Sequence, residues 1–142
     1  MDITVRQIEW YDLNNQDFWD CLRALTEAPT LLMPDAAMIH LRRETYWTLV
    51  AELGERLVGT LTLIIEPKFT HGGSLVGHIE DVAVHPDFQK QGVGSKLLIR
   101  AIALAKEAKC YKLILDCAEE VAPFYEKHDF RRHNLGLRLD VK

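Results

Sequence analysis

The sequence predicts an α/β domain in which helices pack on a mixed sheet. Two observations support this fold class. The chain has 142 residues, a length typical of one compact domain, and no repeat, low-complexity tract or linker divides it. In its second half, strand and helix patterns alternate, which favours a sheet covered by helices. We therefore expect one domain spanning residues 1–142.

The N-terminal half predicts three strands and two helices. Residues 4–10 alternate polar and apolar side chains, as a half-buried strand does. Residues 14–27 begin with two asparagines that suit a helix cap, and their apolar residues recur at helical spacing. Pro34 predicts the start of a second helix, because proline is favoured in the first turn. Residues 46–53 and 57–65 are rich in β-branched and apolar side chains and predict a hairpin.

The C-terminal half begins with a glycine-containing loop at residues 67–77 and a strand at residues 78–84. His85-Pro86 ends that strand, because proline removes a donor from the ladder. Residues 93–106 place their apolar side chains on one face of a helix. The remaining elements are predicted as a short strand, a short helix and a final strand, at residues 112–117, 119–128 and 130–141.

Charge and cysteine content narrow the function. With 17 basic and 21 acidic residues the net charge is −4, so the broad basic field that nucleic acids or anionic membranes require is missing. We expect neither as a partner. The three cysteines form no CxxC pair, so we expect no zinc or other metal. Free thiols and the lack of a signal-peptide pattern predict a cytoplasmic protein.

The most informative segment is Q-K-Q-G-V-G-S at residues 89–95, between a strand and a helix. Gly92 and Gly94 permit a tight turn, and the amides at the start of the following helix favour an anion. The segment lacks the G-K-[ST] ending of a Walker loop, and Leu97 stands where a dinucleotide fingerprint has glycine. Taken alone, the turn is equally compatible with an ordinary helix start.

The apolar strand at residues 79–84, the His85-Pro86 stop, the Q-x-x-G-x-G turn and the helix together resemble the acetyl-CoA signature of the GCN5-related N-acetyltransferase (GNAT) superfamily. This resemblance implies a mixed, mostly antiparallel sheet flanked by helices, with acetyl-CoA as cosubstrate. The cofactor contacts that it implies are Val82, Ala83, Val84, Lys90, Gln91, Gly92, Val93, Gly94, Ser95, Tyr125 and Lys127.

Further motifs resemble one branch of that superfamily, the glucosamine 6-phosphate N-acetyltransferases. They are K-F-T-H at residues 68–71, I-E-D-V-A-V at 79–84, C-Y-K-L-I-L-D-C at 110–117 and F-Y-E-K at 124–127. The resemblance implies acetyl transfer to the 2-amino group of glucosamine 6-phosphate, on the route to UDP-N-acetylglucosamine. It also implies a homodimer with sites near the interface. The implied sugar-phosphate contacts are Thr26, Lys68, His71, Glu80, Asp81, Tyr111, Lys112 and Asp116.

Three side chains are candidates for the chemistry. Tyr125 is the candidate proton donor to the departing thiolate, and packing is its alternative role. Asp116 ends an apolar strand and can orient the amine or cap the next helix. Glu80 is a candidate base, with a water chain as the alternative, and exposed charge is the plainer interpretation of Glu80 and Asp81. Adjacent strand residues point to opposite faces, so we expect only one of these two to face the substrate.

The chain departs from the family pattern at three places. Val121 stands where the family often has an asparagine that bonds the cofactor. Asp129 replaces a glycine, although aspartate tolerates the left-handed turn better than most residues. Asp140 aligns with an arginine that reaches the partner's sugar phosphate, so Arg138 or Lys142 is the replacement if the register shifts.

Two other functions remain compatible with the sequence. A GNAT enzyme acting on a peptide or polyamine amine would keep the superfamily motifs, and an acceptor of that kind would suit the acidic chain. A non-catalytic module that binds acetyl-CoA would keep Gly92 and Gly94 but would not need both Asp116 and Tyr125.

Overall fold

The computed structural model describes residues 2–28 and 44–142. Its five strands form one sheet in the order β1-β2-β3-β4-β5. The first three neighbouring pairs are antiparallel and the β4–β5 pair is parallel, which confirms the mixed, mostly antiparallel sheet. The strands are β1 (Thr4–Gln7), β2 (Tyr46–Leu53), β3 (Arg56–Pro67), β4 (Leu75–Val84) and β5 (Cys110–Ile114).

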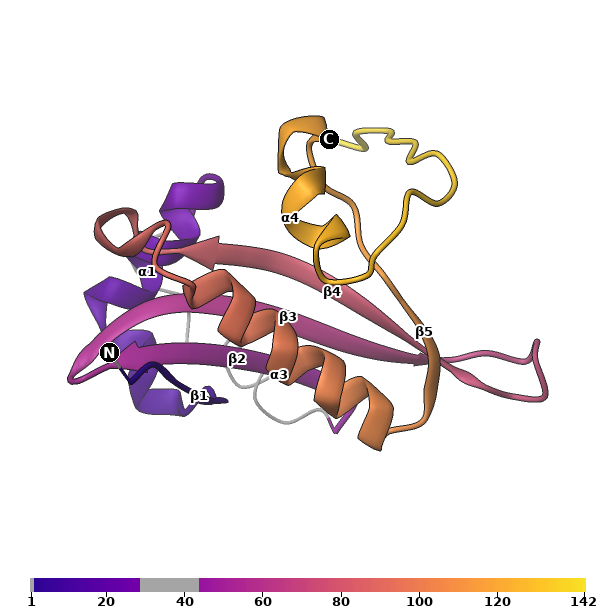
Figure 1. The fold of residues 1–142 in the computed structure, drawn as a ribbon, viewed down its shortest axis with the longest axis horizontal. Coiled ribbons are helices and arrows are strands. Elements are labelled where there is room, and N and C mark those ends of the chain that lie inside the picture. The colour runs from indigo at the N-terminus through magenta and orange to yellow at the C-terminus, as the bar shows by residue number, and fades with distance from the viewer. Residues whose placement is uncertain (1, 29–43) are drawn as a thin grey trace.

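Two long helices cover opposite faces of the sheet (Figure 1). Helix α3 (Val93–Glu107) packs in a cluster that includes Leu49, whereas α1 (Gln16–Leu25) packs in a second cluster that includes Val50. Because successive residues of a strand point to opposite faces, these two neighbours on β2 show that each face has its own core. The expected helix starting at Pro34 lies outside the described residues.

The first strand and the loop after β3 are shorter than expected. Strand β1 ends at Gln7 and a 3-10 helix, η1 (Trp10–Asn14), follows. Its buried Asp12 accepts hydrogen bonds from the backbone N–H of Glu9 and from Arg6, each at 2.8 Å. These contacts turn the chain away from the sheet. The β3–β4 ladder continues to the Pro67–Leu75 pair, so the predicted loop at residues 67–77 is reduced to residues 68–74.

Strands β4 and β5 run side by side for only part of their length. Their ladder ends at the His78–Ile114 pair, whereas β4 continues to Val84. Beyond that pair the chain leaves β5 and forms the 3-10 helix η3 (Glu119–Val121) and α4 (Ala122–Glu126). Figure 1 shows α4 above the free end of β4. The sheet therefore opens between β4 and the segment that carries α4.

The predicted final strand at residues 130–141 is wrong for the single chain. No strand is assigned after β5 among the described residues. The apolar side chains that alternate along this segment are 83–90% exposed: Leu135, Leu137, Leu139 and Val141. A strand requires a neighbouring edge for its backbone hydrogen bonds and a surface for its apolar face, and the segment has neither here. Within the described part of the chain, no helix is long and apolar enough to cross a bilayer.

Candidate active site

A cavity of about 680 Å³ lies where the sheet opens. It is bounded by the end of α1, the end of β4, the turn before α3 and the η3–α4 segment. Ten of the eleven predicted cofactor contacts line it, and only Gln91 does not. Sequence reasoning missed Ala24 and Leu25, because nothing local marks a helix that reaches the site from the opposite face. It also left out Gln89, Glu120, Val121 and Phe124, which line the cavity as well.

The turn before α3 has the backbone that an anion site requires. Gly92 caps the helix with a φ of +84°, in the region where glycine alone has no steric cost. The amides of the first helical turn have no partner within the helix, and the helix dipole is positive at this end. At Gly94, an added Cβ would lie 3.2 Å from the Phe124 ring. Gly92 is thus required by its backbone conformation, and Gly94 by the close approach of Phe124.

Close packing fixes the position of this helix end. An added Cβ at Gly59 would lie 2.7 Å from Val93 Cγ1 and 3.2 Å from the Ala83 carbonyl oxygen. Gly59 on β3 therefore lets α3 approach the sheet closely. At the other side of the cavity, the Ser95 hydroxyl lies 3.0 Å from His128 Nε2. The first turn of α3 is thus attached both to the sheet and to the segment after α4.

A β-bulge interrupts β4 beside the cavity. Thr60 pairs with Ala83 and Thr62 with Glu80, so two residues of β4 lie opposite Leu61. Asp81, at the bulge, has a φ of +49°. Strict alternation stops at this position, and the argument that Glu80 and Asp81 point to opposite faces does not hold here. Both residues are exposed. The bulge lies on the edge that β5 has left, next to Val82.

Tyr125 is the buried acid group of the cavity. Its side chain is 7% exposed and packs edge-on against Phe124 and Phe130, with ring centroids 4.9 and 5.9 Å away. Burial raises the pKa of Tyr125 to about 12, so the phenol keeps its proton at neutral pH.

The turn after α4 forms although Asp129 stands where the family pattern has glycine. Asp129 adopts the left-handed conformation, with a φ of +70°, and the Phe130 N–H donates to the Tyr125 carbonyl at 3.3 Å.

The carboxylates Glu80 and Asp116 lie near each other but outside the lining of the cavity. Glu80 is exposed as a residue, but partial desolvation of its carboxyl raises its pKa, and the charges of Asp81 and Asp116 raise it further. A base with a raised pKa accepts a proton closer to neutral pH, which suits proton removal from an amine. Asp116 is exposed and lies beside the C-terminal segment, because an added Cβ at Gly136 would be 3.7 Å from its Oδ1.

The predicted phosphate-binding side chains form a separate group. The His71 ring stacks on Tyr111 at 4.5 Å, and Lys112 Nζ lies 5.4 Å from the Tyr111 ring centroid. Lys68 Nζ pairs instead with Glu66 at 3.1 Å. This group lies at the start of β5, whereas Asp116 follows its end. Four strand residues span about 13 Å, so these cations lie along β5 away from Asp116 and do not contact it directly.

Thr26, the remaining predicted sugar-phosphate contact, caps the C-terminal end of α1. Its backbone N–H donates to the Leu22 carbonyl at 2.9 Å. Thr26 follows Leu25, which lines the cavity, but does not line it itself.

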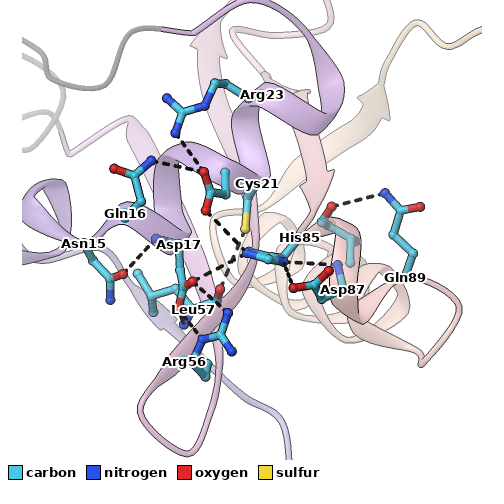
Figure 2. Close-up of polar contacts among 12 residues, drawn as sticks. Asn15, Gln16, Asp17, Cys21, Arg23, Arg56, Leu57, His85, Asp87 and Gln89 are labelled. Atoms are coloured by element: carbon cyan, nitrogen blue, oxygen red, sulfur yellow. Dashed lines mark hydrogen bonds and ion pairs between the residues drawn. The ribbon is translucent and has the colours of Figure 1, made fainter.

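A polar cluster joins α1 to the residues that follow β4 (Figure 2). In it, Asp17, Asp20 and His85 place their ligand atoms within 4.8 Å of one another. Both carboxylates are already paired, since Arg56 donates to Asp17 at 2.7 Å and Arg23 to Asp20 at 2.8 Å. We therefore describe the cluster as an ion-pair network and assign no metal to it.

The comparison with known families decides the identity of the site. The profile of the Acetyltransferase (GNAT) family matches residues 8–130. The chain belongs to the GNAT acetyltransferase family. GNAT enzymes use acetyl-CoA, so this chain is an acetyl-CoA-dependent N-acetyltransferase. The cavity fits that cosubstrate, because an apolar wall along β4 leads to the amide-rich turn before α3.

Curated and solved relatives agree with the family. The chain is 41% identical over 145 residues to the glucosamine 6-phosphate N-acetyltransferase of Trypanosoma brucei brucei, covering 99% of this chain and 97% of that protein. The crystal structure of an acetyltransferase from Trypanosoma brucei matches with a TM-score of 0.85 and 38% identity, covering 99% and 100% of the two chains. The glucosamine-6-phosphate N-acetyltransferase of Arabidopsis thaliana matches with a TM-score of 0.89 and 25% identity over the full length of both chains.

The position of Tyr125 in this GNAT cavity predicts the effect of removing its hydroxyl. We expect Tyr125→Phe to lower kcat about 100-fold, because general acid catalysis contributes at least that much. Acetyl-CoA affinity, measured by calorimetry, should stay close to that of the parent. Tyr11→Phe removes the same hydroxyl from an exposed side chain and serves as the matched control. Unchanged turnover in Tyr125→Phe would remove Tyr125 from the mechanism.

The charges around Glu80 predict a second measurable effect. Removing a neighbouring negative charge favours the ionised form, so Asp116→Asn should lower the pKa of Glu80. Because burial contributes most, the value should remain above the ordinary glutamate range. An NMR titration of the glutamate carboxyl carbons measures both states. Glu66, whose pKa His78 and Lys68 lower, is the internal control and should not move. A Glu80 pKa that is ordinary in the parent protein would contradict the assignment.

Proposed function

We propose that this enzyme acetylates the 2-amino group of D-glucosamine 6-phosphate, giving N-acetyl-D-glucosamine 6-phosphate on the route to UDP-N-acetylglucosamine. The observation that carries the proposal is the Trypanosoma brucei brucei relative, which bears this activity in its name and aligns over 99% of the chain at 41% identity. The other curated relatives support it, since that of Schizosaccharomyces pombe is named for the same activity and is 40% identical over 96 residues.

In the proposed reaction, the sugar amine attacks the acetyl thioester and coenzyme A leaves as the thiol. The attacking nitrogen must lose its proton, and the departing sulfur must gain one. The pKa of Glu80 is raised by desolvation and by the charges of Asp81 and Asp116, which makes Glu80 a stronger base than an ordinary glutamate, and the neighbouring Asp116 would orient the amine. Tyr125, protonated and buried in the cavity wall, supplies the proton for the sulfur. The amides at the start of α3 hold the cofactor's phosphates.

The active form that we propose is a homodimer in which one chain completes the other's site. Two features support it. The cationic group of His71 and Lys112 lies at the opposite end of β5 from Asp116, on an exposed part of the surface that a second chain can approach. In addition, the C-terminal segment exposes alternating apolar side chains, from Leu135 to Val141, which a second chain would cover. The free cysteines suit the cytoplasm as its location.

Another amine acceptor is the competing proposal. The exposed carboxylates of Glu80, Asp81 and Asp116 near the cavity would attract a cationic peptide or polyamine. The sugar proposal differs from it in requiring a negative charge on the acceptor, which His71 and Lys112 would bind. The two proposals therefore predict opposite effects of removing the acceptor's phosphate.

A panel of acceptors tests the substrate. We expect kcat/KM to be at least about 100-fold higher for glucosamine 6-phosphate than for glucosamine, because two charge-assisted hydrogen bonds are lost with the phosphate. In His71→Ala/Lys112→Ala the two substrates should become nearly equal, which ties the preference to these cations. Release of coenzyme A with a polyamine or a peptide, and none with glucosamine 6-phosphate, would overturn the proposed substrate in favour of the alternative.

Mixed dimers test whether sites are shared. Tyr125→Phe and His71→Ala/Lys112→Ala should each keep only about a hundredth of the parent activity on glucosamine 6-phosphate, but their heterodimer contains one intact shared site. After unfolding and refolding at equal amounts, we expect about a quarter of parent activity, since half of the dimers are mixed and each has one intact site of two. The control is Tyr125→Phe mixed with a variant that carries all three substitutions in one chain, and its activity should stay near that of Tyr125→Phe alone. No recovery in the first mixture would show that each chain builds its own site.

A further inference from the structure

His85 connects the two sides of the cavity, although it does not line it. It follows the last residue of β4 and precedes the 3-10 helix η2 (Pro86–Phe88). Its backbone N–H donates to the Val58 carbonyl at 2.8 Å, and its carbonyl accepts from the Phe88 N–H at 2.9 Å. The side chain is 7% exposed. A histidine buried this deeply requires partners for both ring nitrogens.

Each ring nitrogen faces a different element (Figure 2). Nδ1 accepts a hydrogen bond from the backbone N–H of Asp87 at 3.2 Å. Because Nδ1 is the acceptor, the neutral ring carries its hydrogen on Nε2. Nε2 points at helix α1, where it lies 3.5 Å from Asp17 Oδ1 and 3.7 Å from Asp20 Oδ2. The imidazole therefore bridges the turn that follows β4 and the helix on the opposite face.

The two carboxylates are held in place for this contact. Arg56 donates to both oxygens of Asp17 at 2.7 and 2.9 Å, and the Leu57 N–H donates to the same side chain at 3.3 Å. Asp20 accepts from Arg23 at 2.8 Å and from Gln16 at 3.1 Å. These bonds lower the pKa of both carboxyl groups, so both are ionised at neutral pH.

Arg56 also lies over the ring of Phe88, with its guanidinium carbon 5.2 Å from the centroid. It thereby links the start of β3 to η2, just as His85 links η2 to α1. The contacts close a ring through α1, β3 and η2. Such a ring holds the three elements in one arrangement more firmly than any of its single pairs would.

The elements that this ring joins carry two walls of the cavity. Ala24 is four residues after Asp20 on α1, so both lie on the same face of the helix, and Ala24 and Leu25 line the cavity. On the other side, Val84 precedes His85 and the turn at Lys90 and Gly92 follows it, and all three line the cavity. The bridge therefore connects the helix that carries one wall of the cavity with the segment that leads to the other.

We propose that His85 is a positioning residue for acetyl-CoA. Its imidazole holds α1 against the segment that leads from β4 to the turn before α3, so that the cavity is preformed. The proposal rests on the use of acetyl-CoA by this family and is independent of which amine is acetylated. When the bridge is broken, only part of the population has the wall in place, and the apparent affinity falls by that fraction. Bound acetyl-CoA restores the arrangement, so turnover at saturation should change little.

Two amide variants separate the halves of the bridge. His85→Asn puts an oxygen near the position of Nδ1, so it can accept from the Asp87 N–H, but it is too short to reach α1. His85→Gln puts a polar atom near the position of Nε2, so it can reach Asp17, but it leaves the Asp87 N–H to water. Both replace the same ring by an amide, so loss of packing affects both.

We expect His85→Asn to raise the Kd and the KM for acetyl-CoA about tenfold, as when the wall is in place a tenth of the time, with kcat within about twofold of the parent. His85→Gln should keep both constants within about threefold. Asp17→Asn should weaken binding as His85→Asn does, and the double variant should be no weaker than the worse single variant. Binding is measured by calorimetry with acetyl-CoA alone, and turnover with glucosamine 6-phosphate.

Two results would overturn the proposal: parent-like acetyl-CoA affinity in His85→Asn, or equal weakening in the two amide variants. If His85→Asn does not fold, an unchanged affinity in Asp17→Asn overturns it as well. The calorimetric arm requires no acceptor amine, so a failure of the proposed sugar substrate leaves this test intact.

Discussion

The separation of β4 from β5 is the constraint on which the site depends. Past the His78–Ile114 pair the ladder ends, and the backbone of β4 continues to Val84 beside the cavity. Buried N–H and C=O groups require partners, so an extended ligand that offers amide groups of its own complements this edge. The bulge at Asp81 turns the strand locally, and Gly92 follows eleven residues later. The opening therefore determines where the cofactor arm, its phosphates and the acetyl group must lie.

Local groups, not the net charge, allow an acidic chain to bind anions. With a net charge of −4, the chain lacks a basic field that would attract a polyphosphate, and the amides at the start of α3 would supply the binding instead. Among the described residues of the cavity lining, Lys90 and Lys127 carry positive charge. The carboxylates of Glu80, Asp81 and Asp116 lie close by, where they would destabilise an anion but favour an amine. Charge is thus divided between a cofactor end and an acceptor end of one opening.

The sequence predicted most of the residues that line the cavity, whereas the predicted acceptor contacts lie in separate places in the structure. The turn at residues 90–95, the strand at 82–84 and Tyr125 depend on local geometry, which a continuous motif records. The left-handed turn at Asp129 could be predicted for the same reason. By contrast, Ala24 and Leu25 reach the cavity from α1 through tertiary packing, and no pattern in residues 14–27 marks them. The bulge at Asp81 depends on the register between two strands, and the role of His85 depends on three elements meeting, so neither could be read from one segment.

The C-terminal segment shows why an alternating pattern can be correct and its predicted strand still absent. Alternating apolar side chains predict which face of a strand is buried once the strand is paired. They do not predict the edge with which the strand pairs. Leu135, Leu137, Leu139 and Val141 remain exposed in the single chain, and exposing four large apolar side chains together is unfavourable. The cations at the start of β5 also lack a clear role in the single chain, because they lie at the opposite end of the strand from Asp116 of the same chain. A second copy related by twofold symmetry would cover this segment, and the cations of that copy would lie at the acceptor site of the first chain. Both features are therefore explained by the proposed homodimer, whereas a monomer would leave each of them without a function.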